Sequence, residues 1–149
     1  MRGNKVMYVI KEDIFAFHNS AYAIGLPTNS SYRDDGTAIA SDEVTKEFGK
    51  RYPDFEQELG DKLCLYGNDV FYFINSNSFS FPDRNRWFDK PDLKIIERSC
   101  VQLKNHPEYL CGRPLLMPKV GCYVGGAKWE DVESLLEYYL PEILIITKE

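Results

Sequence analysis

Residues 118–137 have the sequence PKVGCYVGGAKWEDVESLLE. The end of an apolar run, Leu115–Val120, is followed there by the glycine-containing loop Gly121–Gly126 and by an amphipathic stretch that begins near Trp129. This pattern predicts a strand, a loop and a helix. The first backbone N–H groups of a helix have no partner within it and carry partial positive charge, so the junction could bind an anion such as phosphate. Glycines also occur at such junctions only to make the turn, and the loop alone leaves both interpretations open.

The composition indicates a single globular domain over residues 1–149. Of the 149 residues, 44% are hydrophobic and 28% are charged, which is enough apolar material for one core. The formal charge of −5 argues against a broad nucleic-acid surface. No apolar run approaches the length of a membrane span, and the first residues lack the apolar region of a signal peptide, so we expect a cytoplasmic protein without membrane contact. The four cysteines have no C-x-x-C spacing and predict neither a disulfide framework nor a metal site.

The C-terminal half of the chain alternates between predicted helices and strands. Asp92–Leu103 and Trp129–Tyr139 have the apolar spacing of amphipathic helices, and Pro141 ends the second one. The run Ile143–Ile146 is apolar on both faces and therefore predicts a strand with neighbours on both sides. Strands alternating with helices are typical of an α/β fold with a mostly parallel sheet.

The N-terminal half predicts a strand, a long loop, a helix and a hairpin. Lys5–Ile10 predicts a strand, and Pro27–Ala40 has the turn residues of a surface loop. Ser41 is a suitable N-cap for a helix that ends before Pro53. Two apolar runs flank Gly67-Asn68 and predict a β-hairpin there; they are Lys62–Tyr66 and Asp69–Ile74. Asn75–Lys90 is rich in Ser, Asn and Pro and is expected to be a loop.

Several motifs occur in an order that resembles a macrodomain. They are Lys11-Glu12-Asp13-Ile14-Phe15 after the first strand, Phe48–Pro53 at the end of the first helix, Pro118–Gly126, and Trp129-Glu130-Asp131-Val132. The resemblance is to the branch of terminal ADP-ribose protein glycohydrolase and ADP-ribose 1″-phosphate phosphatases, and it extends over essentially the whole chain. It implies a three-layer α/β/α fold with a mixed sheet that binds ADP-ribose or a related adenine nucleotide and needs no metal or cofactor.

The resemblance also implies which residues bind the ligand. Asp13 would accept a hydrogen bond from the adenine amino group, and Ile14 would offer its backbone N–H to the ring. Without the resemblance, Asp13 is an ordinary turn residue at the end of a strand. The second ligand loop would consist of Gly121, Cys122, Tyr123, Val124, Gly125 and Gly126. Tyr123 replaces a small residue of the family, and its ring could close over the ligand, fill the space of a phosphate, or pack on a neighbour.

The first ligand loop departs from the family pattern and allows two alignments. An ungapped match places Ser41–Thr45 at the diphosphate, with Asp42 and Glu43 facing the anion, which Coulomb repulsion disfavours. A gapped match uses a neutral loop instead, Gly36-Thr37-Ala38-Ile39-Ala40. We prefer the gapped match and expect Gly36, Thr37 and Ala38 at the ligand.

Catalysis by the lysine and aspartate of the glycohydrolase branch is not expected. Ser76 or a neighbour is aligned with the lysine, and Gly125 is aligned with the aspartate. Neither serine nor glycine can form the covalent adduct of that mechanism. A hydrolase would then need a carboxylate or histidine to activate water, and the weak candidates are His18, Asp34, Asp35 and Asp83. The alternatives are a binding module without turnover and a macrodomain fold that has lost its ligand.

An aromatic group within Asn75–Lys90 also has two interpretations. Its members, interleaved with Arg84 and Arg86, are Phe79, Phe81, Trp87 and Phe88. They could form a lid packed on the edge of the sheet, or a stacking wall beside the ligand to which Arg86 adds positive charge.

Overall fold

The chain folds around a mixed six-stranded sheet. The computed structural model describes residues 7–111, 114–122 and 126–148. The strands are β1 (Tyr8–Lys11), β2 (Ala23–Thr28), β3 (Tyr72–Phe73), β4 (Ser78–Pro82), β5 (Leu115–Met117) and β6 (Leu144–Thr147). Their spatial order is β1-β6-β5-β2-β4-β3, and all neighbours are parallel except β3 and β4. The predicted mixed α/β sheet is confirmed, and β6 has neighbours on both sides as expected.

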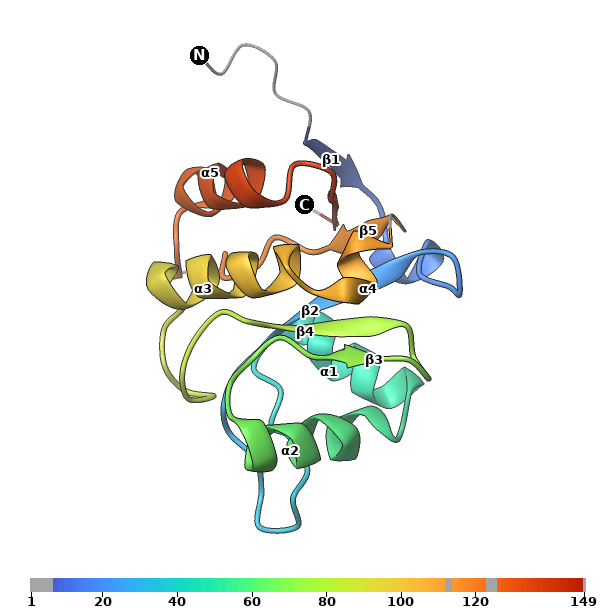
Figure 1. Cartoon of the computed structure of the whole chain (residues 1–149), viewed down its shortest axis with the longest axis vertical. Coiled ribbons are helices and arrows are strands. Elements are labelled where there is room, and N and C mark those ends of the chain that lie inside the picture. The colour runs from blue at the N-terminus through green and yellow to red at the C-terminus, as the bar shows by residue number, and fades with distance from the viewer. Residues whose placement is uncertain (1–6, 112–113, 123–125, 149) are drawn as a thin grey trace.

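Helices cover both faces of this sheet, which gives three layers. They are η1 (Ile14–Ala16), α1 (Glu43–Arg51), α2 (Phe55–Tyr66), α3 (Leu93–Lys104), α4 (Pro107–Leu110) and α5 (Trp129–Tyr139). Figure 1 shows α3 and α5 on one side of the sheet and α1 and α2 on the other.

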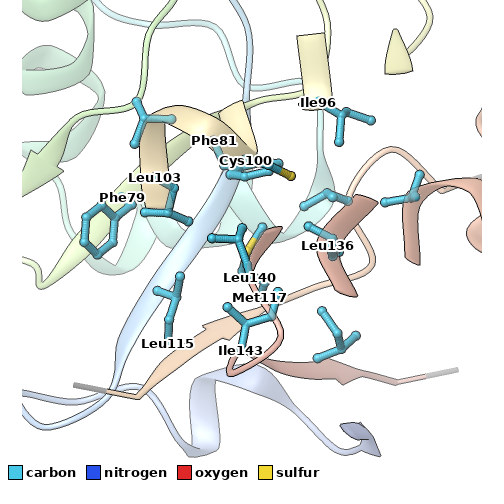
Figure 2. Close-up of a cluster of buried hydrophobic side chains, with 14 of the residues drawn as sticks. Phe79, Phe81, Ile96, Cys100, Leu103, Leu115, Met117, Leu136, Leu140 and Ile143 are labelled. Atoms are coloured by element: carbon cyan, nitrogen blue, oxygen red, sulfur yellow. The ribbon is translucent and has the colours of Figure 1, made fainter. Parts of the chain in front are cut away.

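Two hydrophobic cores lie between the layers. Successive strand residues point to opposite faces, so Met117 belongs to the core under α3 and α5, whereas Leu116 belongs to the core over α1 and α2. Figure 2 shows the first core, in which Leu103 of α3 and Leu136 of α5 lie over the sheet. Gly25 of β2 leaves room for Met117, because a Cβ at residue 25 would lie 2.8 Å from Met117 Cγ.

The predicted hairpin at Gly67-Asn68 is wrong. Lys62–Tyr66 is the last part of α2, and Gly67 follows the helix with φ 90°, a conformation that glycine adopts readily at a helix C-terminus. The strands of the real hairpin are β3 and β4, and Asn77 lies in the turn between them with φ 49°. The expected loop Asn75–Lys90 therefore contains a buried central strand, β4.

Other element boundaries agree more closely with the predictions. The helix Trp129–Tyr139 has the predicted bounds. α1 begins one residue later than expected, because Asp42 is the N-cap: its Oδ1 accepts the Val44 N–H at 2.8 Å. Ser41 instead donates its hydroxyl hydrogen to the Trp87 carbonyl oxygen at 2.7 Å. Within the described residues, no helix is both long and apolar enough to span a membrane.

Candidate functional site

The candidate site lies where the carboxyl ends of the parallel strands meet at one edge of the sheet. In an open α/β sheet this edge is the usual place for a ligand. Asp13 follows β1, the loop to α1 follows β2, Asp83 follows β4, and Pro118–Ala127 follows β5. In Figure 1 the connections that leave β4 and β5 lie on the same side of the molecule.

A pocket of about 550 Å³ lies beside Asp13. Its lining comes from the segment after β1 with η1, from one side of α1 along its whole length, from the residue after β5 and from the end of β6; it comprises Glu12, Asp13, Ile14, Phe15, Glu43, Val44, Glu47, Arg51, Pro118, Ile146, Thr147 and Lys148. Asp13 Oδ1 accepts the Phe15 N–H at 3.0 Å and so starts η1. The Ile14 side chain is buried, and the part of the chain that the structure describes holds no acceptor for its N–H. The two residues thus offer a carboxylate acceptor and an N–H donor at one pocket.

The lining of this pocket includes an aromatic ring with a guanidinium group over it. Arg51 Cζ lies 4.3 Å from the centroid of the Phe15 ring, and Arg51 Nε lies 3.1 Å from Glu47 Oε2. Among the described residues, the pocket is lined by four acidic side chains and by two basic ones, Arg51 and Lys148. Its negative balance suits an amino group better than a phosphate.

The N-terminus of α1 connects this pocket with the end of β4. Glu43 and Val44 line the pocket, and the preceding residue, Asp42, lies close enough to Asp83 for the two charges to interact. Burial raises the pKa of Asp42, and the negative charge of Asp83 raises it further, against the opposing effect of the Val44 N–H.

Asp83 and Arg84 form a buried ion pair at the carboxyl end of β4. Arg84 Nε lies 2.8 Å from Asp83 Oδ1 and Nη2 lies 3.2 Å from Oδ2, so the pair is bidentate. Burial raises the pKa of Asp83 although Arg84 and the backbone N–H of Gly121 both lower it. Asp83 therefore lies close both to Asp42, in the loop before α1, and to Gly121, in the loop after β5.

The segment expected to be the second ligand loop, Gly121–Gly126, is described at its two ends only. Gly121 has φ 70°, a backbone conformation that favours glycine, and a Cβ there would make a tight contact of 3.2 Å with Ile96 Cδ1. Ala127 N–H closes the loop on the Gly121 carbonyl oxygen at 2.9 Å. Burial raises the pKa of the Cys122 thiol to about 11, which keeps it protonated near neutral pH. Tyr123, Val124 and Gly125 lie outside the described residues.

Gly36, Thr37 and Ala38 do not line the pocket beside Asp13. They pack against α2: the Ala38 N–H donates to the Glu56 carbonyl oxygen at 2.8 Å, and the Gly36 carbonyl oxygen lies where a Cβ on Gly60 would be, at 1.7 Å. Within Ser41–Thr45, the alternative first loop, Glu43 and Val44 line the pocket and Asp42 lies near Asp83.

The weak catalytic candidates are not brought together. Asp34 and Asp35 are exposed, and Asp35 Oδ1 accepts the N–H and the hydroxyl of Thr37 within a turn. His18 lies near the amino end of β4, where its Nε2 is 2.9 Å from the Ser76 carbonyl oxygen and Nδ1 is 3.3 Å from Tyr52 Oη. Burial lowers the pKa of His18.

The alignment of Ser76 with the catalytic lysine is wrong in position. Ser76 precedes β4 and so lies at the opposite end of this strand from Asp83 and Gly121. The error follows from the misplaced hairpin: once β4 is known, Asp83 and Arg84 are the residues at its carboxyl end. Sequence reasoning placed Asp83 among the candidates but did not connect it with Arg84, Asp42 and Gly121.

Comparisons with known proteins identify the fold. No protein-family model matches the chain. A curated DNA ADP-ribosyl transferase-DNA ADP-ribosyl glycohydrolase fusion protein of Thermosipho africanus is 24% identical over 133 residues, which cover 81% of this chain and 33% of the relative. The chain thus spans about a third of the length of the curated relative it matches.

Solved structures match almost the whole chain. The macrodomain of Mycobacterium tuberculosis DarG has a TM-score of 0.75 at 17% identity and covers 98% of this chain and 100% of its own. The macrodomain of Thermus aquaticus DarG has a TM-score of 0.74 at 15% identity, with 96% and 97% covered. Thermosipho africanus DarTG in complex with ADP-ribose has a TM-score of 0.76 at 17% identity, with 97% of this chain and 42% of that chain covered. The chain therefore has the macrodomain fold.

Proposed function

We propose that the chain binds ADP-ribose or a related adenine nucleotide along the carboxyl edge of the sheet. The observation that carries the proposal is the pocket in which the Asp13 carboxylate and the Ile14 N–H lie together beside the first turns of α1. An adenine ring offers an amino donor and a ring-nitrogen acceptor, which match these two groups. The structural neighbour solved with ADP-ribose supports the same choice.

The remainder of the ligand would run from this pocket past the N-terminus of α1 towards Gly121. The family's second-loop role then falls to Gly121, Cys122, Tyr123, Val124, Gly125 and Gly126. For the first loop, the position of Asp42 near Asp83 supports the ungapped alignment, which uses Ser41–Thr45. Gly36, Thr37 and Ala38 pack on α2 and do not line the pocket beside Asp13.

The charges along this path predict modest affinity for the diphosphate. Asp42 and Asp83 lie next to the proposed diphosphate path, and the Gly121 N–H lies close enough to Asp83 to lower the pKa of its carboxyl group. An anion there competes with a carboxylate for the same donor and is repelled by both acids. Arg84, paired with Asp83, reduces this repulsion.

Hydrolysis of an ADP-ribosylated substrate is a second candidate function, favoured by the same acids. Asp42 and Asp83 both have a raised pKa and lie at the proposed cleft, a combination typical of groups that accept or donate protons. The curated relative's name includes a DNA ADP-ribosyl glycohydrolase. We propose that Asp42, the less buried of the two acids, orients water at the distal ribose of a cytoplasmic ADP-ribosylated substrate.

Calorimetric titration with ADP-ribose, AMP and NAD tests the binding proposal. We expect ADP-ribose to bind, and AMP to bind more weakly because it lacks the second phosphate and ribose. Asp13→Ala should weaken ADP-ribose binding about 10- to 100-fold, since a hydrogen bond to a charged group is lost. Asp34→Ala, at an exposed loop position, is the matched control and should not change the affinity. No heat of binding for any of the three ligands would refute the proposal.

A further inference from the structure

Large apolar side chains are exposed at several places away from the pocket of the candidate site. One is the turn after β4, where Trp87 and Phe88 belong to neither hydrophobic core. The interpretation of these two residues as a lid packed on the sheet is therefore wrong, whereas Phe79 and Phe81 are core residues of β4. Another place is helix α5, where the side chain of Tyr138 is 77% exposed and borders a groove.

This groove has a volume of about 760 Å³ and lies between α3 and α5. Figure 1 shows the two helices side by side over the same face of the sheet. Leu93 and Leu135 give the groove apolar surface, and the Tyr138 ring meets the Tyr139 ring edge to face with centroids 4.8 Å apart. The Tyr139 hydroxyl donates to Glu97 Oε2 at 2.8 Å and so joins α5 to α3. The shape of the groove is therefore held by contacts between the helices.

The two helices that form the groove carry opposite charges. α3 has three basic residues and one acidic residue, whereas α5 has four acidic residues and no basic one. Lys94 of α3 and Asp131 of α5 both line the groove, and within the described residues neither side chain has an ion-pair partner. The charges of Lys94 and Asp131 are therefore available to a binding partner.

This pattern of charge fits a second copy of the chain better than a partner of one charge sign. A uniformly basic or acidic partner would be attracted by one helix and repelled by the other. A two-fold axis that runs along the groove instead places α3 of each copy on α5 of the other, so both contacts join opposite charges. The same arrangement packs the exposed Tyr138 of each copy against α3 of the other.

The size of this surface predicts a weak dimer. α3 has 12 residues and α5 has 11, so the helices are about 18 Å and 16 Å long at roughly 1.5 Å per residue. Neighbouring helix axes lie about 8–10 Å apart, and pairing the two outer faces would bury on the order of 1,000 Å² in total. This area is at the low end for specific interfaces, and we expect a dissociation constant of about 10–100 μM.

We propose that two copies of the chain associate through the groove between α3 and α5, with Lys94 of each copy paired with Asp131 of the other. Because the contact is symmetrical, each dimer contains this ion pair twice. Neither residue lines the pocket beside Asp13, so the inference does not depend on the proposed function.

Sedimentation velocity of the whole chain tests the inference, at protein concentrations from about 5 to 500 μM. The variants are Lys94→Glu, Asp131→Lys and an equimolar mixture of the two. Lys50→Glu and Asp54→Lys are the matched controls, because they make the same charge changes at exposed residues on the other side of the sheet. Thermal unfolding shows whether each variant folds as the wild type does. Lys94→Glu should fold normally, since an acid in the first turn of a helix is favourable.

We expect the wild type and both control variants to dimerise alike, and Lys94→Glu and Asp131→Lys each to weaken the dimer at least about tenfold, because like charges then face each other twice. The mixture should restore dimers, since the introduced carboxylate of one variant faces Lys94 or the introduced ammonium group only across an opposite-charge contact. The inference is overturned if the wild type stays monomeric over the whole range, if the control variants weaken the dimer as much as the groove variants, or if the mixture associates no better than each variant alone.

Discussion

At the scale of single residues, Asp42 has two roles that conflict. It caps α1, and its charge lies beside Asp83 where the diphosphate of the ligand would pass. Asparagine caps a helix about as well as aspartate but carries no charge. The substitution Asp42→Asn therefore separates the two roles.

We expect Asp42→Asn to bind ADP-ribose about fivefold more tightly than wild type at pH 8, on the order of 1 kcal/mol, because one repulsive charge is removed. The pKa of Asp42 is raised, so the wild-type residue takes up a proton as the pH falls towards its pKa, and the difference between the proteins should disappear there. Titration calorimetry from pH 8 to pH 4.5 measures this. Equal affinities of wild type and Asp42→Asn at pH 8 would show that the Asp42 charge does not reach the ligand.

At the scale of elements, the loop after β2 can contact helix α2 because Gly60 of this helix has no Cβ atom. A Cβ on Gly60 would lie 1.7 Å from the Gly36 carbonyl oxygen and 3.1 Å from the Ala38 nitrogen, both of them backbone atoms that cannot rotate away. A Cβ on Gly49 of α1 would instead approach the carboxylate of Glu56 at 2.9 Å, which is the movable end of a side chain.

We expect Gly60→Ala to lower the free energy of unfolding by about 1–3 kcal/mol, because the loop must move away from α2 and this outweighs the better helix propensity of alanine. Gly49→Ala should be neutral or stabilise the protein by up to about 1 kcal/mol. Urea denaturation compares the two. Equal stability of both variants would mean that the loop yields without cost.

At the scale of the whole molecule, the two histidines both make the free energy of unfolding depend on pH, and in the same direction. Burial lowers the pKa of His18 and of His106. A histidine whose folded pKa lies below its unfolded value of 6.5 stabilises the fold above pH 6.5, and this contribution is lost as the pH falls through the unfolded pKa towards the folded one. Asp42 and Asp83, with raised pKa values, act in the opposite sense: their contribution is complete below 3.8 and is lost as the pH rises.

We therefore expect the free energy of unfolding to fall between pH 8 and pH 5.5, and the fall to be smaller in His18→Gln. Urea denaturation at several pH values measures the slope, and the difference between wild type and variant isolates His18 from the carboxyl groups. His106→Gln provides the second half of the comparison. A slope that neither substitution changes would place the pH dependence in other groups.

The molecule also shows where sequence reasoning succeeds and where it fails. Trp129–Tyr139 was predictable because its acidic first turn, its apolar stripe and Pro141 all indicate the same helix. β4 was not, because serines alternate with Phe79 and Phe81 and resemble loop residues. Their hydroxyls are buried and satisfied, as when Ser80 Oγ donates to the Asp69 carbonyl oxygen at 3.0 Å. Because β4 was not predicted, the proximity of Asp83 to Gly121 was not predicted either. These two residues are distant in sequence, and β4 brings them to the same edge of the sheet.

The contact of Gly36 with Gly60 has a consequence for the history of the fold. The backbone of the loop between β2 and α1 contacts α2 directly at Gly60. We therefore expect the length of the loop and the residue at position 60 to vary together among related chains. Relatives that keep glycine at the position of Gly60 should also keep a loop of this length between β2 and α1. Relatives with a larger residue there should have a shorter loop that leads more directly into α1. Residue 60, which does not line the pocket beside Asp13, would then mark which members of the lineage share this form of the first loop.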